Sequence, residues 1–190
     1  PLINGDVEVI VPDGSGGWYI GGAFTKVGTA SRSRAARINS DGTLHSWNPI
    51  LSVSSGVAKV NAIVVASDGV YLGGNFETVN STSRSNVVKL DKADASIIAG
   101  WTGAANSAVY ALALSSDGSS IFVGGSFSEL NGTAQQRFGK LSSANGSKQD
   151  APNFDNYVYS IATSSGSVYV GGNFEYVTPV GGSFTSRRAL

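Results

Sequence analysis

Short runs of apolar and β-branched residues alternate with polar, glycine-containing segments along the whole chain. Two such runs lie at 7–11 and 18–20, and the dipeptide Asp13-Gly14 stands between them. Asp-Gly between β-forming runs favours a tight hairpin turn, because glycine adopts positive φ without a steric penalty. The runs are short and bounded by turn residues, so the pattern predicts antiparallel strands and not helices.

The same arrangement recurs four times around a Gly-Gly-x-Phe motif, with the phenylalanines spaced by 52, 51 and 47 residues. We expect the Gly-Gly pair to end the second strand in a bulge or tight bend, where a Cβ would clash. We expect the phenylalanine to enter the core between repeats. The motif residues are Gly21, Gly22, Phe24, Gly73, Gly74, Phe76, Gly124, Gly125, Phe127, Gly171, Gly172 and Phe174.

Each repeat continues after the phenylalanine with a third apolar run and a weaker fourth one. The third run ends near Ile38 and Leu90 in the first two repeats, and the fourth covers about 44–47 and 97–101. Four short strands in up-and-down order make up a propeller blade. The sequence therefore predicts an all-β protein, a β-propeller of about four four-stranded antiparallel blades. The predicted blades are 1–50, 51–104, 105–153 and 154–190, the last one incomplete.

The chain opens at a first-strand pattern and stops midway through the third strand of its fourth repeat. A missing last strand would leave an unpaired sheet edge. We therefore expect residues 1–190 to be a single repeat domain that is a fragment of a larger propeller. Missing blades or a second copy of the chain would complete it.

These motifs resemble the bacterial β-propeller repeats called delta-60 repeats, whose units read V-x-A-L-A, Y-V-G-G-x-F, V-N-G, R-x-x-L-A-x-L-D and G-x-x-x-x-W. The resemblance covers essentially the whole chain and implies a secreted or surface-attached bacterial protein. Gln135 and an insertion around 179–182 depart from the pattern. The matching positions in the second repeat are Tyr71, Gly73, Gly74, Phe76, Val79, Asn80, Arg84, Leu90, Asp91 and Trp101.

Composition and charge argue against several classes of partner. Thirteen basic and thirteen acidic residues give a formal net charge of zero, so we expect no nucleic-acid partner. No apolar run is long enough to span a bilayer, and we expect no membrane insertion. The absence of cysteine excludes disulfides and thiolate metal sites. The lack of both cysteine and methionine favours an extracellular or cell-surface location.

A position that is basic in three of the four repeats follows the Gly-Gly-x-Phe motif. Arg32 and Arg84 lie eight residues after their phenylalanines, Gln135 takes that place in the third repeat, and Arg187 follows the insertion in the fourth. These arginines can grip a carboxylate or a sugar at a rim. A position repeated in nearly every unit more simply serves the repeat, with each guanidinium forking onto carbonyls or a carboxylate of the next blade.

Metal and catalytic chemistry have little support in the sequence. Glu77, Glu129 and Glu175 follow three of the phenylalanines, and a ring of them can hold calcium. No calcium-loop motif accompanies them, so we expect no cofactor, with calcium the one possibility kept open. His45 is the only histidine, too few for a zinc site, and we interpret it as a surface residue without a catalytic role.

The densest aromatic and polar cluster is in the fourth repeat, where Tyr157 and Tyr159 stand beside Asn153 and Asp155. Such a cluster suits stacking on a sugar or contact with a protein. We therefore expect a non-enzymatic binding or adhesion module that presents loops to a protein or glycan ligand. Two alternatives stay open: a secreted propeller hydrolase or lyase acting on polysaccharide, and a structural spacer in a fibre.

Overall fold

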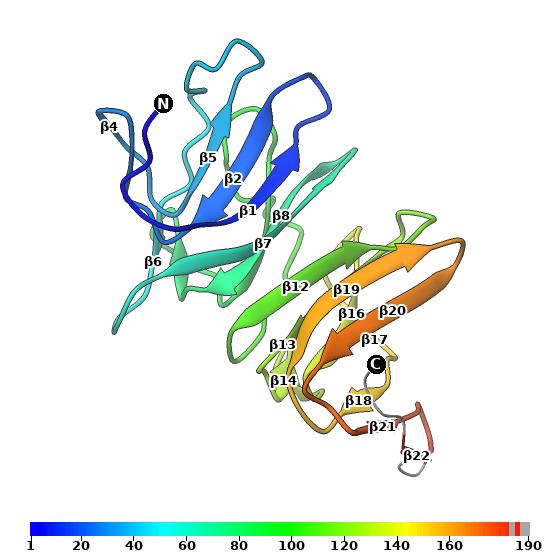
Figure 1. Ribbon diagram of the computed structural model, residues 1–190. Coiled ribbons are helices and arrows are strands. Elements are labelled where there is room, and N and C mark those ends of the chain that lie inside the picture. The colour runs from blue at the N-terminus through cyan, green and yellow to red at the C-terminus, as the bar shows by residue number, and fades with distance from the viewer. Residues whose placement is uncertain (183–184, 187–190) are drawn as a thin grey trace. The chain divides into compact units, whose positions relative to one another are not determined.

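The computed structural model describes residues 1–182 and 185–186, and this part of the chain is built of strands and turns without helices (Figure 1). All its paired strands are antiparallel. The predicted all-β, antiparallel class is therefore confirmed. Two compact units divide the chain, Pro1–Ile98 and Ala99–Leu190.

The N-terminal unit contains two three-stranded sheets of the same design, in which the strand with the Gly-Gly motif is central. Both orders place the first and third strands of a repeat on either side of the second, as expected for consecutive short strands joined by tight turns. The first sheet has the order β1 (Val7–Pro12), β2 (Trp18–Gly22), β5 (Ala35–Ile38), and the second β7 (Lys59–Ala66), β8 (Gly69–Asn75), β11 (Val87–Leu90).

The C-terminal unit repeats this design in a four-stranded sheet and a two-stranded one. The Gly-Gly strand again pairs with the strand that precedes it in the chain. The four-stranded sheet has the order β12 (Val109–Leu114), β13 (Ser120–Gly125), β16 (Phe138–Ser142), β17 (Lys148–Gln149), and the two-stranded sheet joins β19 (Val158–Ser164) to β20 (Ser167–Gly172).

Tight turns join the first and second strands of each repeat, as the Asp-Gly signals predict. Glycine occupies the left-handed region in three of them, with φ of 83° at Gly14, 72° at Gly118 and 81° at Gly166. Residues with a Cβ are strained in that region, which is why these turns contain glycine. The hairpin prediction is confirmed.

The expected fourth strand differs between repeats. Within the described residues it is a strand in the third repeat, where β17 pairs with β16. In the first two repeats it shrinks to single bridges, Ile38 with Leu44 and Leu90 with Ile97. The chain then leaves the sheet and buries Trp47 completely in a cluster that residues of the first and second repeats share. Burying this large side chain takes precedence over further strand pairing.

A small second sheet follows each phenylalanine, and no pattern in the sequence predicts it. In the second repeat, β9 pairs on both sides; equivalent pairs are single bridges in the first and third repeats, Ile3 with Val27 and Ala105 with Leu130. Strands of two residues are too short to show a period of two. These strands are β3 (Lys26–Val27), β4 (Ala30–Ser31), β6 (Leu51–Ser52), β9 (Thr78–Val79), β10 (Thr82–Ser83), β14 (Glu129–Leu130), β15 (Thr133–Ala134), β18 (Asn153–Phe154), β21 (Tyr176–Thr178) and β22 (Thr185–Ser186).

The motif phenylalanines are all buried. Phe76 shares a cluster with Trp47 of the preceding repeat, and Phe174 shares one with Phe138. Phe24 instead packs within its own repeat. The expectation of a core between repeats is thus correct for Phe76 and Phe174. It is wrong for Phe24, because the described residues of its cluster all belong to the first repeat.

Candidate functional site

A β-bulge lies in the first strand of each repeat, opposite the Gly-Gly pair. In the first repeat Val7 pairs with Gly22 and Val9 with Gly21, which leaves Glu8 as the extra residue. A bulge bends the strand and re-aims the side chain at the extra position. The backbone is therefore the same in every repeat, while the residue presented differs. The four bulge residues are Glu8, Asn61, Tyr110 and Tyr159.

The two motif glycines are required for different reasons. A Cβ on Gly22 would lie 2.0 Å from the carbonyl oxygen of Asp6, the residue that precedes the bulged strand of the same repeat. A Cβ on Gly21 would lie 2.6 Å from Cγ1 of Val60, in the next repeat. The second glycine thus leaves room for the backbone at the bulge, and the first leaves room for a side chain of the neighbouring repeat. The prediction that a Cβ would clash here is confirmed.

Three tyrosine rings come together in the C-terminal unit, where β12 and β19 lie side by side (Figure 1). The ring centroids of Tyr110 and Tyr159, the two bulge residues, are 5.5 Å apart. The ring of Tyr157 lies 6.3 Å from each of them. Tyr157 and Tyr159 keep 39% and 47% of their surface exposed. These three residues are called the tyrosine cluster below.

Polar groups border the tyrosine cluster. The guanidinium carbon of Arg137 lies 5.3 Å from the ring centroid of Tyr157, a cation–π distance. Nδ2 of Asn173 donates a hydrogen bond of 3.3 Å to the hydroxyl of Tyr159. Arg137 is fixed by a left-handed backbone, φ 63°, and by a 3.1 Å hydrogen bond from Nη1 to the carbonyl of Phe127. The surface therefore offers aromatic faces edged by a cation and an amide.

The sequence predicted Tyr157 and Tyr159 as site residues but missed Tyr110 and Arg137. Tyr110 stands in a strand pattern that resembles every other first strand, so the pattern alone predicts an ordinary strand residue there. The signal that reveals it is the bulge, which places position 110 in the same role as position 159. Register of this kind is visible only in the folded sheet.

None of the hydrogen bonds described for Asn153 connects it to the tyrosine cluster. Its Oδ1 accepts hydrogen bonds from the backbone N–H of Gln136, at 2.7 Å, and from Nε2 of Gln135, at 3.1 Å. The side chain holds two segments of the unit together. Its contacts are those of a structural residue.

Asp155 has a similar place. Its Oδ1 accepts hydrogen bonds from the backbone N–H groups of Glu175, at 3.0 Å, and Tyr176, at 3.1 Å. Asn4 and Asn106 make the same pair of contacts in the first and third repeats. A short polar side chain at this position therefore belongs to the repeat and ties the segment before the first strand to the one after the phenylalanine.

The repeated arginines bind backbone carbonyls. Nη1 of Arg32 donates to the carbonyl of Ser31 at 2.8 Å, and Nη2 donates to that of His45 at 2.9 Å. Nη1 of Arg84 donates to the carbonyl of Ser83 at 2.9 Å. The fork geometry of the guanidinium suits such pairs of acceptors. The carbonyls belong to the arginine's own repeat and not to the next one.

Gln135, which replaces the arginine in the third repeat, is buried and keeps the same type of partner. Its Nε2 donates to the carbonyl of Phe138 at 2.8 Å and also approaches the carbonyls of Ala151 and Pro152. An uncharged amide therefore replaces the guanidinium as a donor to backbone carbonyls. Arg187, the candidate of the fourth repeat, lies outside the described residues.

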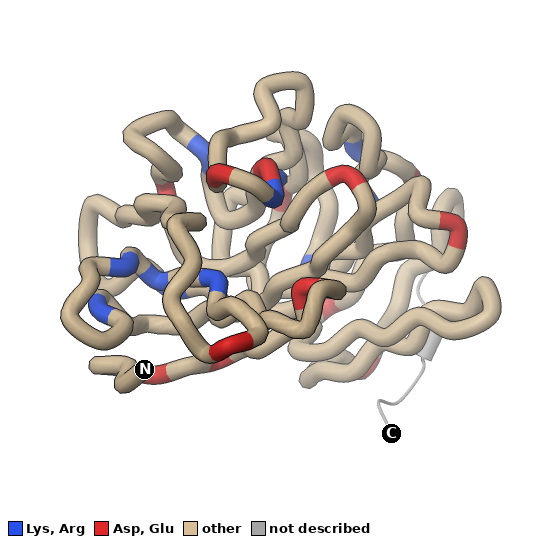
Figure 2. Tube along the Cα trace, turned by 90° about the horizontal axis from the view of Figure 1, so that it is seen from above, with Lys and Arg blue, Asp and Glu red and all other residues tan. Residues whose placement is uncertain are grey.

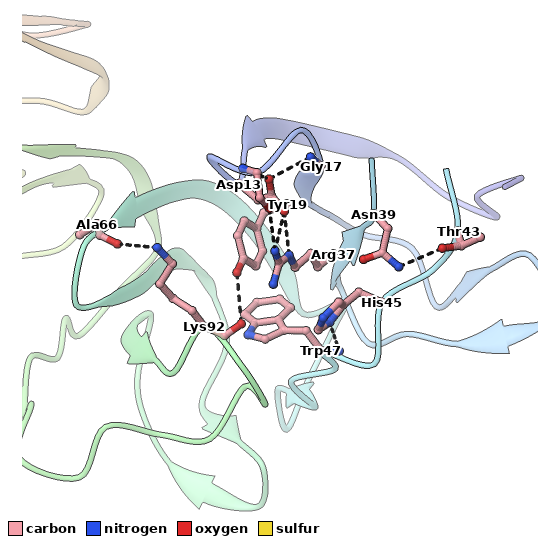
Figure 3. A network of polar contacts seen from close by, with 11 residues as sticks. Asp13, Gly17, Tyr19, Arg37, Asn39, Thr43, His45, Trp47, Ala66 and Lys92 are labelled. Carbon is pink, nitrogen blue, oxygen red and sulfur yellow. Dashed lines mark hydrogen bonds and ion pairs between the residues drawn. The ribbon is translucent and has the colours of Figure 1, made fainter. Parts of the chain in front are cut away.

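A polar network in the N-terminal unit surrounds the first hairpin turn (Figure 3). Arg37 donates from Nε and Nη2 to Oδ2 of Asp13, at 2.9 and 2.7 Å, and its guanidinium lies 5.4 Å from the ring centroid of Tyr19. The backbone N–H groups of Ser15 and Gly17 donate to Oδ1. Burial favours a higher pKa for Asp13, but these hydrogen bonds outweigh it and hold the pKa well below its ordinary value.

The same network continues to the second repeat. Nε1 of Trp47 donates to the carbonyl of Asp91 at 2.8 Å, and the hydroxyl of Tyr19 donates to that of Lys92 at 3.4 Å (Figure 3). The backbone N–H of Trp47 donates to Nδ1 of His45 at 3.0 Å. The side chain of His45 thus helps to position the backbone of Trp47. These contacts stabilise the first repeat and its packing against the second.

Charged positions are spread along the trace, and neither sign covers a whole unit (Figure 2). Glu77 accepts hydrogen bonds from the N–H and hydroxyl of Ser54. Across the residues that the structure describes, no three His, Cys, Asp or Glu side chains are grouped in a way that could hold a metal ion. That same part of the chain has no helix long and apolar enough to cross a bilayer.

Comparison with known proteins connects the first repeat to a propeller family. The family model described as "Domain of unknown function (DUF5122) beta-propeller" matches residues 12–44. The match runs from the end of β1 through the Gly-Gly-x-Phe motif to the bridge at Leu44. No curated protein matches the chain. The match therefore supports a β-propeller repeat family for this chain.

Proposed function

We propose that this chain is a non-enzymatic binding module of a secreted or cell-surface bacterial protein. Its four repeats act as propeller blades of the delta-60 type, and its ligand is a glycan. The tyrosine cluster is the contact surface. The observation that carries the proposal is the convergence of Tyr110, Tyr157 and Tyr159 at an exposed surface, with Arg137 and Asn173 at its border.

The chemistry of the cluster fits a sugar. Tyrosine combines an apolar ring face with a hydroxyl, so it stacks on the C–H face of a sugar and still exchanges hydrogen bonds. Few rotatable bonds keep the entropic cost of ordering tyrosine low, which makes it a frequent residue in recognition surfaces. The hydroxyl of Tyr159 is already oriented by Asn173. A partly fixed ring loses less freedom when a ligand binds.

The bulge gives a second reason for a binding role. Its backbone is the same in four repeats, yet the residues presented are glutamate, asparagine and two tyrosines. Residues that only build the repeat stay alike, as the paired glycines do. A constant backbone with a variable side chain is the arrangement expected where a rigid scaffold displays recognition groups.

Glycan-array binding with a matched pair of variants tests the proposal. Tyr159→Ala removes a ring of the cluster, and Tyr169→Ala removes a tyrosine that is 62% exposed on β20 of the same two-stranded sheet. We expect the wild type to bind a defined set of glycans. Tyr159→Ala should weaken that binding at least about tenfold, since truncating a central aromatic contact removes 1.4 kcal/mol or more. Tyr169→Ala should leave it unchanged.

Three results would contradict the proposal. The first is an array on which no glycan is retained, and the second is equal weakening by both variants. The third is turnover of a bound polysaccharide, which would instead indicate a hydrolase or lyase. A pull-down that recovers a protein partner sensitive to Tyr159→Ala, with no glycan bound, would keep the binding role and replace the ligand class.

A further inference from the structure

A cavity of about 230 Å³ opens in the N-terminal unit, beside the segment that follows the first Gly-Gly-x-Phe motif. Two alternate positions of that segment, Arg32 and Arg34, both line it. Asn48 and Ile50, which follow the buried Trp47, close another part of its wall. This cavity, called the arginine pocket below, is separate from the tyrosine cluster, since it is formed by other residues in the other unit.

The arginine pocket carries uncompensated positive charge. Both guanidinium groups donate to backbone carbonyls: Arg32 to Ser31 and His45, and Arg34 through Nη1 to Ala23 and Phe24 at 3.0 and 3.1 Å. Neither takes part in a salt bridge among the described residues, and no acidic side chain lines the pocket. Arginine forks match the geometry of a carboxylate better than any other cation in proteins.

Other groups in the pocket match the rest of a sugar ring. Oδ1 of Asn48 is buried and has no hydrogen-bond partner among the described residues, so a hydroxyl that reached it would meet a free acceptor. The side chains of Thr25, Ser31 and Ser33 add hydroxyl groups to the lining. Ile50, 56% exposed, supplies an apolar surface for the C–H face of a ring. The volume suits one small residue and not a large ligand.

The other repeats show that this combination is specific to the first one. The second repeat has Arg84 at the position of Arg32 but Asn86 at that of Arg34. The third has Gln135 and Arg137. Nε of Arg32, Arg34, Arg84 and Arg137 is buried and unpartnered in each case, so that feature belongs to the repeat. The first repeat alone, compared with the second and third, combines both arginines with Asn48, whose Oδ1 has no hydrogen-bond partner among the described residues.

We propose that the arginine pocket binds the carboxylate of an acidic sugar, a uronic-acid residue of a polysaccharide. Arg32 and Arg34 hold the carboxylate, Asn48 accepts a ring hydroxyl, and Ile50 contacts the ring face. The inference rests on the pocket alone and does not depend on a ligand at the tyrosine cluster.

Titration of the intact chain with galacturonate, followed by the NMR shifts of its backbone amides, tests the proposal. We expect saturable shifts around 31–34 and 48–50, absent or at least about tenfold weaker with neutral galactose, because a charge-assisted hydrogen bond is lost. Arg32→Gln, which installs the residue of the third repeat, should weaken binding by a similar factor. Arg84→Gln makes the identical change in the second repeat and should have no effect.

Arg34→Asn serves as a second variant, because asparagine already occupies the left-handed position in the second repeat, φ 63° at Asn86 against 72° at Arg34. It should fold normally and also lose affinity. The proposal is overturned if galactose or inorganic sulfate binds as tightly as galacturonate, or if a short poly-glutamate peptide binds more tightly. Equal loss in Arg84→Gln, or loss in Tyr159→Ala, would place any binding elsewhere.

Discussion

Asp13 shows how one turn residue acquires a second role from its neighbours. Its place before Gly14 is explained by turn chemistry, and the backbone N–H groups of Ser15 and Gly17 bind it as expected there. Arg37, on β5, then converts the turn residue into half of a buried ion pair. The second repeat has a lysine in the same place, with Lys89 2.6 Å from Asp68. An acid–cation pair therefore closes the hairpin in both repeats.

We expect Asp13→Asn to reduce stability and to change its dependence on pH. The lowered pKa of Asp13 means that its contribution is complete above the ordinary value of about 3.9 and is lost as the pH falls below it. At pH 7 the loss should be about 2 kcal/mol, below that of a fully buried pair because the Arg37 side chain is 19% exposed. Urea unfolding from neutral to acidic pH measures both effects.

Asp6→Asn, at an exposed acid of the same unit, is the control and should shift stability only slightly. The variant Asp13→Asn should unfold with a flatter acid limb than the wild type. An unchanged acid limb would show that the pair contributes nothing, despite its burial.

At the scale of elements, the bulge and its glycine act as one device. The bulge brings the carbonyl of the residue before the first strand towards the Gly-Gly pair, so that only glycine fits there. Gly125 shows the same constraint in the C-terminal unit, where a Cβ would lie 2.2 Å from the carbonyl oxygen of Ala108. The device explains the second glycine of the motif and why Tyr110 is re-aimed.

Gly125→Ala should therefore destabilise the C-terminal unit by about 1–3 kcal/mol or more, because a backbone atom cannot yield as a flexible side chain can. Gly100→Ala is the matched control, since nothing lies within 4 Å of a Cβ there. Denaturant unfolding of both variants gives the comparison. If Gly125→Ala lost no more stability than Gly100→Ala, the bulge would tolerate a Cβ, and a clash with the backbone would not explain the glycine at position 125.

At the scale of the whole molecule, charge is balanced. The formal net charge is zero, the sequence pI is about 7.2, and charged positions of both signs are spread along the trace (Figure 2). Exposed aromatic residues such as Tyr159 and Tyr169 add apolar surface. Proteins near zero net charge lack the mutual repulsion that keeps molecules apart. Association between molecules should therefore be strongest close to neutral pH.

Light scattering at a series of pH values measures the strength of this association. The second virial coefficient should be lowest near pH 7 and rise towards about pH 4.5 and about pH 10, where carboxylates gain protons or lysines lose them. Added salt should weaken the dependence through screening. A coefficient that does not vary with pH would show that apolar contacts, and not charge balance, govern association.

The repeat, the hairpins and the all-β class can all be predicted from the sequence alone. These follow from local chemistry: Asp-Gly turns, short apolar runs and the Gly-Gly-x-Phe anchor act over a few residues and recur at constant spacing. The sequence also identifies Tyr157 and Tyr159, which stand close together in the chain. Asn153 and Asp155 are near them in the sequence but bind the backbone of other segments, because proximity in sequence does not fix where a side chain points.

Which side chains meet depends instead on the packing of the folded chain. Tyr110 reaches Tyr159 because two bulges in adjacent strands aim both outwards, and register is set by pairing across the sheet. Trp47 leaves its predicted strand, and its indole is buried in a cluster that joins the first repeat to the second. Arg32 and Asn48 line one pocket although they are far apart in the sequence. Such contacts depend on packing between distant segments, which local pattern does not encode.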